Sequence, residues 1–221
     1  MLSVFRRPPD PAAASAWFAG SSGKALLDSE AACVRAALQQ FPRQRSLWLG
    51  PAAARLVTAE AQAPSLCLHP VSAPELAGDL RCGLPLPLAS ECFAVVIVQH
   101  ALEMTAEPEL LLEECARVLI PGGWLWLLAL NPLAPFRWRW TGHGLRGREP
   151  MTWRRRLRAV GLQPEPVSQG LGAGWRTGSE IHPHPGVGLR PAFLLRCEKR
   201  TLPLTPIRKP RAIGLQAGTP A

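Results

Sequence analysis

The sequence predicts an α/β fold built on a parallel sheet, because strand-like and helix-like segments alternate through its first 130 residues. Four segments are apolar along most of their length, which is typical of strands covered on both faces of a sheet. They are residues 46–50, 65–70, 91–100 and 124–130. The third holds the run Phe-Ala-Val-Val-Ile-Val and is the clearest strand, because β-branched and aromatic residues favour extended backbone.

Two helices are expected around these strands. From Lys24 onwards, apolar residues recur at intervals of three and four and share one helical face, until Pro42 ends the pattern. A second helix begins at Pro108, which is tolerated in a first turn, and stops at the Pro-Gly-Gly of residues 121–123. Its inner stripe consists of Leu111, Cys115 and Val118.

The last third of the chain has a different composition. Residues 131–150 form a loop broken by proline and glycine, in which tryptophan and arginine alternate. A helix over 149–162 follows, and a final strand is expected over 190–200. One face of that helix is expected to be buried through Trp153. The opposite face is expected to be solvated and carries Arg154, Arg155, Arg156 and Arg158.

Composition divides the chain into one domain and two flanking segments. Residues 1–16 are rich in proline and alanine and are expected to be flexible. Residues 17–200 form the predicted domain, and residues 201–221 form a basic, proline-rich tail. A hydrophobic content of 47% in 221 residues is enough for one sizeable core.

Charge and cysteine usage bear on partners and compartment. The net charge is +9, and arginine supplies 22 of the 25 basic residues. This suits anionic partners, although a general preference for arginine in the genome explains it equally well. The six cysteines form no Cys-x-x-Cys pair, which favours reduced thiols in a cytoplasmic protein over disulfides or a zinc site. We expect no signal peptide and no membrane span, and no feature indicates the oligomeric state.

Short motifs in the middle of the chain carry a resemblance to a known family. They are Leu84-Pro85, Phe93-Ala94-Val95-Val96, His100-Ala101-Leu102-Glu103 and the Arg-Val-Leu-Ile-Pro-Gly-Gly of 117–123. Together they resemble class I S-adenosylmethionine-dependent methyltransferases of type 11. With its flanks, the resemblance covers most of residues 17–209 and is nearest to a proteobacterial subgroup. It implies a Rossmann-like, mainly parallel sheet of about seven strands with helices on both faces, and a cofactor at the topological switch point.

The resemblance implies that S-adenosylmethionine binds on the loop after the first strand, formed by Leu49, Gly50, Pro51 and Ala52. In the family this loop is rich in glycine, because the backbone must approach the cofactor without a Cβ atom in the way. Only Gly50 is retained here, so the motif is degenerate. Both a narrowed cofactor loop and a simple connection between a strand and a helix are compatible with these residues.

Further cofactor contacts are implied at the ends of the next strands. His69 stands where the family places a ribose-binding acid, and a neutral imidazole offers one acceptor nitrogen in place of two oxygens. Cys82, Gly83 and Leu84 are expected along the adenine edge, and Gln99 beside the methyl donor. An acid usual in this family after the phenylalanine of the 91–100 strand is absent.

His100 is the candidate catalytic residue, because a histidine at this edge can act as a general base. A structural histidine that bonds a neighbouring loop is the alternative. Methyl transfer depends mainly on proximity and orientation, so the lack of a catalytic triad or metal cluster is compatible with an enzyme. No metal site is expected, because His182 and His184 are two ligands without a third.

Three functions therefore fit the sequence. The first is an S-adenosylmethionine-dependent methyltransferase that acts on an unknown acceptor. The second is a catalytically inactive methyltransferase-like binding or scaffold protein. The third is RNA binding through residues 136–158, where eight arginines and three tryptophans could neutralise phosphates and stack bases. The alternative for that region is tryptophans packed over the sheet and arginines in solvent.

Overall fold

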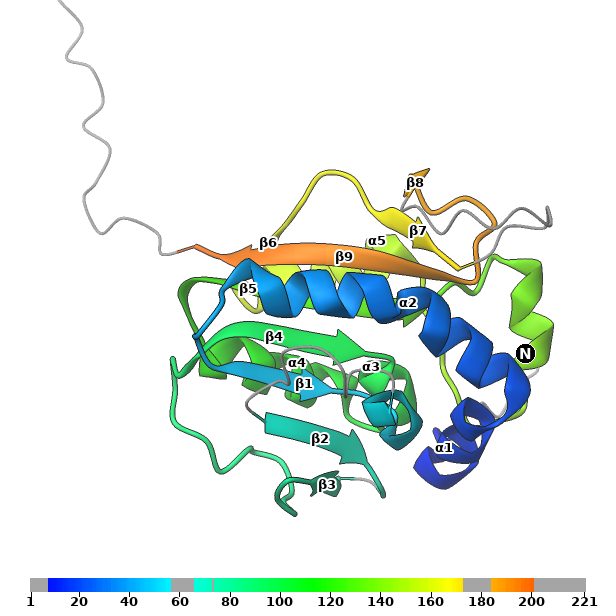
Figure 1. Ribbon diagram of the computed structural model, residues 1–221, viewed down its shortest axis with the longest axis horizontal. Coiled ribbons are helices and arrows are strands. Elements are labelled where there is room, and N and C mark those ends of the chain that lie inside the picture. The colour runs from blue at the N-terminus through cyan, green and yellow to red at the C-terminus, as the bar shows by residue number, and fades with distance from the viewer. Residues whose placement is uncertain (1–7, 57–65, 73, 173–183, 201–221) are drawn as a thin grey trace, which may run out of the picture.

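The computed structural model describes residues 8–56, 66–72, 74–172 and 184–200. Its centre is one sheet with the strand order β3-β2-β1-β4-β5-β9-β7-β8, and β6 also pairs with β9 (Figure 1). The strands are β1 (Ser46–Leu49), β2 (Leu66–Pro70), β3 (Leu76–Gly78), β4 (Phe93–Gln99), β5 (Leu119–Leu130), β6 (Leu162–Pro164), β7 (Gln169–Leu171), β8 (His184–Pro185) and β9 (Ala192–Lys199).

The four central strands, β2-β1-β4-β5, are parallel, and the sheet becomes antiparallel towards both edges. The α/β prediction is confirmed, and the parallel part is confined to this centre. The antiparallel β3 follows from the chain length available. Only residues 71–75 join β2 to β3, whereas a parallel crossover needs about a dozen or more residues. The Asp79 carboxylate, which accepts from the Cys67 N–H at 2.7 Å, fastens this hairpin.

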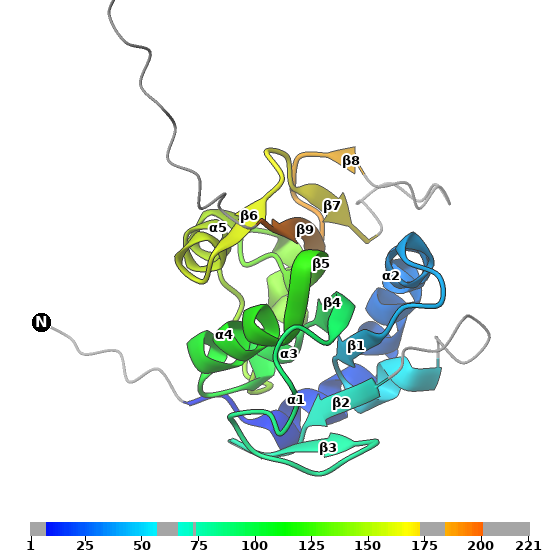
Figure 2. The ribbon, with the colours of Figure 1, turned by 90° about the vertical axis from the view of Figure 1, so that its left-hand side faces the viewer.

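Helices cover both faces of the sheet, as predicted (Figure 2). Because side chains alternate along a strand, Trp48 of β1 packs with α1 (Pro11–Ala19) and α2 (Ser21–Gln40). Leu47 and Leu49 point to the other face, towards α4 (Pro108–Val118) and α5 (Pro150–Ala159). The predicted stripe of α4 is fully buried: Leu111, Cys115 and Val118.

The expected flexibility of residues 1–16 is wrong for its second half. Residues 11–16 belong to α1, whose N-cap Asp10 accepts hydrogen bonds from the Ala12 and Ala13 N–H groups. Alanine is the best helix former, so a cap is enough to start a helix in this alanine-rich segment. Phe18 then anchors the helix and is fully buried. Residues 1–7 and 201–221 lie outside the described residues.

The α5 helix also differs from expectation, because Arg154 is buried and Arg156 is half-buried. Trp153 and Leu157 are buried, whereas Arg155 and Arg158 are exposed, as predicted. Arg154 is buried, because it donates to the Glu165 carbonyl and to Ser168 Oγ at 2.9 Å in the segment that covers the helix. The two acceptors lie 11 and 14 residues after Arg154, beyond the end of the helix, so the helical periodicity alone placed Arg154 in solvent.

Two further features concern the cysteines and the length of the helices. All six cysteines lie in the described part of the chain and are reduced thiols. Among the described residues, no helix is both long enough and apolar enough to cross a membrane.

Candidate functional site at the carboxyl edge of the sheet

The strand order brings the predicted site residues to one edge. The chain goes from β1 outwards to β2, then returns to place β4 on the other side of β1, which makes the gap between β1 and β4 a topological switch point. Leu49 is level with Leu68 on one side and with Val98 on the other. The next residues, Gly50, His69 and Gln99, therefore lie side by side at the carboxyl edge of the sheet.

The loop after β1 is closely packed around Gly50. Its N–H donates to the Leu68 carbonyl at 3.1 Å, and a Cβ atom here would lie 2.4 Å from Cζ2 of Trp48. Leu49 and Pro51 are buried, and Ala52 is exposed at the start of the short helix η1 (Ala52–Leu56). The neighbouring indole ring is thus a sufficient reason for glycine at position 50.

The residues expected near adenosine are more open. His69 is half-buried in β2 and lies opposite Ala77 of β3. Cys82 is half-buried and exchanges two backbone hydrogen bonds with Leu76. Gly83 is exposed, with nothing within 4 Å of the place where a Cβ atom would stand.

Two residues of α4 hold the segment that follows Gly83 in place. Leu84 is half-buried, and the Leu86 N–H donates to Glu114 Oε2 at 2.7 Å. Arg117 donates to the Leu86 and Leu88 carbonyls at 3.0 and 2.8 Å and pairs with Glu114 at 2.8 Å. The Arg117 hydrogen bond keeps the pKa of Glu114 below its usual value. These side chains fix the predicted adenine edge, and only Arg117 stood within a recognised motif.

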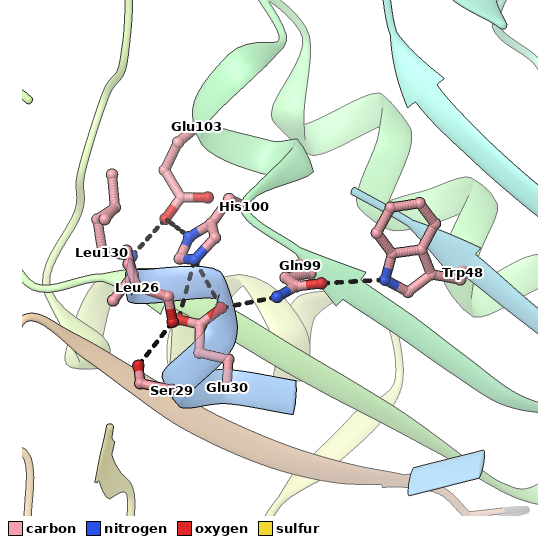
Figure 3. Close-up of polar contacts among 8 residues, drawn as sticks. All are labelled: Leu26, Ser29, Glu30, Trp48, Gln99, His100, Glu103 and Leu130. Atoms are coloured by element: carbon pink, nitrogen blue, oxygen red, sulfur yellow. Dashed lines mark hydrogen bonds and ion pairs between the residues drawn. The ribbon is translucent and has the colours of Figure 1, made fainter. Parts of the chain in front are cut away.

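A buried polar network joins α2 to Trp48 of β1 and to the end of β4 (Figure 3). Glu30 of α2 accepts from Gln99 Nε2 at 2.8 Å, and both of its oxygens lie 3.0 Å from His100 Nε2. Gln99 Oε1 in turn accepts from Trp48 Nε1 at 3.2 Å. Glu30 and His100 are 0% exposed, and Gln99 is 2% exposed. The polar groups of Gln99 are therefore bonded within the protein.

His100 is enclosed on its other sides as well. It adopts a left-handed conformation, φ 55°, as the N-cap of α3 (Ala101–Met104), and Phe18 stacks on its ring with centroids 5.0 Å apart. Its Nδ1 lies 3.9 Å from Glu103 Oε1, which accepts from the Leu130 N–H at 2.7 Å. Within the described residues, neither His100 Nδ1 nor Glu103 Oε2 has a hydrogen-bond partner.

The charge state of His100 follows from its neighbours. Burial by itself lowers the pKa of the imidazole, but the carboxylates of Glu30 and Glu103 outweigh it and raise the pKa to about 10. At neutral pH the ring is an imidazolium ion that holds a proton on each nitrogen. In that form it has no lone pair with which to accept a proton from a substrate.

A cavity of about 810 Å³ opens next to this network. We call it the α2–η2 cavity, because it lies between α2 and the short helix η2 (Pro135–Arg139) that follows β5. The residues before β9 complete its wall. Side chains that line it include Ser22, Leu26, Ser29, Phe136, Trp138 and Arg139. A second cavity of about 320 Å³ adjoins it at Ser29 and Gly172.

The tryptophans of the arginine-rich region do not form one stacking surface. Trp140 and Trp153 are buried, at 7% and 0% exposure, and only Trp138 is open to solvent, at 72%. This agrees with tryptophans packed against the fold. His182 lies outside the described residues, and within them no three His, Cys, Asp or Glu side chains are grouped as metal ligands.

Sequence reasoning missed Glu30, the centre of the network. A signal was present, because Glu30 falls within the apolar stripe of its helix, between Leu27 and Val34. A carboxylate on a buried helical face needs a partner. The partner could not be named from the sequence, since His100 is 70 residues away.

Comparison with known proteins agrees with the resemblance found in the middle of the sequence. The family model described as "Methyltransferase domain" matches residues 50–127, from Gly50 into β5. Within residues 50–127 the chain therefore carries a methyltransferase domain. S-adenosylmethionine is the methyl donor that this family implies. No curated protein sequence gives a significant match to this methyltransferase.

Solved structures show the same fold. A Thermotoga maritima S-adenosylmethionine-dependent methyltransferase, described as a possible histamine N-methyltransferase, has a TM-score of 0.57 and 17% identity, covering 84% of this methyltransferase and 94% of that chain. A Mesorhizobium loti methyltransferase has a TM-score of 0.50 and 18% identity, covering 78% and 99%. One from Archaeoglobus fulgidus has a TM-score of 0.50 and 13% identity, covering 76% and 94%. The predicted Rossmann-like fold is confirmed.

Proposed function

We propose that the methyltransferase moves a methyl group from S-adenosylmethionine to an acceptor held in the α2–η2 cavity. The observation that supports this most is the placement of that cavity. Ser29 lines it, and the next residue, Glu30, is bonded to Gln99 at the end of β4. The cavity thus adjoins the switch-point edge, where ligands of α/β folds bind. The reduced thiols support a cytoplasmic location.

The described residues fit the two ends of the cofactor unequally. His69, Cys82, Gly83 and Leu84 form a partly exposed edge that suits a nucleoside. At the methionine end, Gly50 faces the Trp48 ring and Gln99 is bonded within the protein. We infer that Leu49–Ala52 and this open edge hold the cofactor, and that Gln99 acts from behind the loop.

When bound, S-adenosylmethionine supplies an electrophilic methyl group, which an acceptor lone pair takes as the carbon–sulfur bond breaks and its electrons stay on sulfur. The protein then has to align the acceptor and exclude water. His100 is a positioning residue in this proposal, since its imidazolium ties α2 to β4 through Glu30. This ion pair fixes the position of the α2 side chains that line the cavity, which include Leu26 and Ser29.

A second candidate function is an inactive methyltransferase-like scaffold. The observation in its favour is that Gly50 packs against the Trp48 ring and that both polar groups of Gln99 are hydrogen-bonded to other side chains of the protein. The RNA-binding alternative has less support, because two of the three tryptophans in its region are buried.

Calorimetry with S-adenosylmethionine and S-adenosylhomocysteine on the full chain distinguishes the two candidates. We expect micromolar binding that is lost in Gly83→Trp, because the new ring would fill the nucleoside edge. That variant should fold, since nothing lies within 4 Å of the Gly83 Cβ position. Ala89→Trp, at an exposed position in the same segment, is the matched control and should bind as the parent does. If no heat of binding is detected at millimolar ligand, the methyltransferase candidate is excluded and the scaffold candidate remains.

A further inference from the structure

The lining of the α2–η2 cavity indicates what kind of acceptor it takes. We propose that the acceptor is an apolar carboxylic acid, with its carboxylate on Arg139 and its apolar body between α2 and η2. This inference rests on the proposed methyl transfer and specifies the chemical class of its acceptor.

The size and walls of the cavity suit an apolar body. A volume of about 810 Å³ is within the range of small-molecule sites, which are lined mainly by apolar and aromatic side chains. Leu26 and Phe136 contribute to the walls. Trp138 and Leu189 also line it and are 72% and 62% exposed. Large apolar side chains gathered around one opening indicate a surface that a ligand covers.

The charge of the cavity suits an anion. Among the described residues that line it, Arg139 is the single ionisable side chain. The acidic residues of α2 do not line it, because Glu30 faces His100 on the other side and Asp28 lies outside the wall. The adjoining cavity is lined by Arg190 and by Arg196, which is paired with Glu165 at 2.8 Å, and within the described residues no carboxylate lines it. A cationic amine would meet repulsion here and find no counter-ion.

Arg139 is held in place for this role. Its backbone carbonyl accepts from Trp17 Nε1 at 2.6 Å, and its Nη1 donates to Ser22 Oγ at 3.3 Å. The Trp17 ring also meets Phe136 edge-on, with centroids 6.3 Å apart. The other guanidinium N–H groups of Arg139 have no protein acceptor within the described chain. They are therefore available to a ligand.

One guanidinium matches one carboxylate. An arginine fork binds a carboxylate through two parallel N–H···O bonds and neutralises its single charge. A phosphate dianion would keep an uncompensated charge against the apolar walls, where desolvation is costly. A monoanionic carboxylate therefore fits this lining better than a phosphate.

Three naphthyl probes of different charge test the inference: 1-naphthylacetate, the isosteric 1-naphthylacetamide, and the smaller cation 1-naphthylmethylamine. Each is titrated calorimetrically into the full chain, alone and with S-adenosylhomocysteine. We expect the acetate to bind about 10-fold or more tighter than the amide, since hydrogen bonds to a charged group are the stronger ones. The amine should bind weakest.

Substitutions assign the preference to Arg139. Arg139→Gln should reduce acetate affinity to that of the amide and leave amide affinity unchanged, and Arg139→Lys should restore part of the preference as a point charge. Trp138→Ala should weaken the acetate and the amide by the same factor. Arg155→Gln, at an exposed α5 position outside the cavity, is the matched control and should change nothing.

The outcomes separate this inference from the proposed function. Equal affinity for the three probes, no binding by any of them, or an acetate preference that survives Arg139→Gln overturns the carboxylate inference. If that happens while S-adenosylhomocysteine binds, methyl transfer stands and only the acceptor class falls. If naphthylacetate binds through Arg139 but S-adenosylhomocysteine does not bind, methyl transfer falls, and with it the acceptor role of the cavity.

Discussion

The buried pair of Glu30 and His100 is expected to make the stability of the fold depend on pH. Folding raises the pKa of His100 from 6.5 to about 10. A group with a raised folded pKa stabilises the fold fully below its unfolded pKa, and this stabilisation is lost as pH rises towards the folded pKa. The loss therefore begins near pH 6.5. Between pH 6.5 and 8.5 we expect the free energy of unfolding to fall by about 2 kcal/mol.

The pH range of this prediction ends at 8.5 because the ionisation of buried thiols also changes the free energy of unfolding at higher pH. Burial raises the pKa of Cys33 to about 11 and that of Cys197 to about 12, from a usual value of 9.0. Burial also raises the pKa of Cys115. Above the usual thiol pKa the unfolded chain loses these protons first, which destabilises the fold independently of His100. Below it, the slope belongs to the imidazole.

Removing one member of the pair tests the same quantity. Glu30→Ala should cost about 3–5 kcal/mol at pH 6.5, the usual effect of breaking a buried ion pair. Glu30→Gln keeps the shape and should flatten the slope between pH 6.5 and 8.5.

Urea unfolding followed by tryptophan fluorescence measures both effects at pH 6.5, 7.5 and 8.5. His143→Gln, at an exposed loop position, is the control and should keep the parent slope. A parent protein with no slope in this window, or a Glu30→Gln variant that retains the full slope, would refute the assignment to the Glu30–His100 pair.

Two further predictions concern packing and burial. Gly50→Ala should lower the free energy of unfolding by about 1–3 kcal/mol with or without cofactor, because the new methyl group meets the Trp48 ring. Gly83→Ala should change it by less than about 0.5 kcal/mol, and equal costs for the two variants would contradict the Trp48 explanation. Arg154→Ala should cost about 1–3 kcal/mol in the same assay, because it leaves the Glu165 carbonyl without its donor. Arg155→Ala, on the exposed face, should stay within about 0.5 kcal/mol, and a larger loss there than at Arg154 would be the contrary result.

Local pattern was enough for the main elements of the fold. The strands β1, β2, β4 and β5 and the helix α4 were predicted because each is encoded by contiguous apolar runs or a regular spacing. The segment of residues 11–16 was misjudged because an alanine-rich composition does not reveal the Asp10 cap that starts α1. The antiparallel β3 was missed because three residues carry too little pattern.

The site was predictable only in part, for the same reason. That Gly50, His69 and Gln99 would meet at one edge followed from placing each at the end of a parallel strand. What each side chain does there depends on contacts across long stretches of chain. Gln99 bonds Glu30 and Trp48, which lie 69 and 51 residues away.

Periodicity and motifs within short segments encode the α/β alternation, the class of fold and the edge at which the site lies. How that edge is used depends on contacts that form when the chain folds. Folding places Trp48 against Gly50, encloses His100 as an imidazolium between two carboxylates, and leaves Arg139 facing a cavity. The physical reason is that packing and pKa values depend on which groups meet in space, and a pattern along the chain does not encode those meetings.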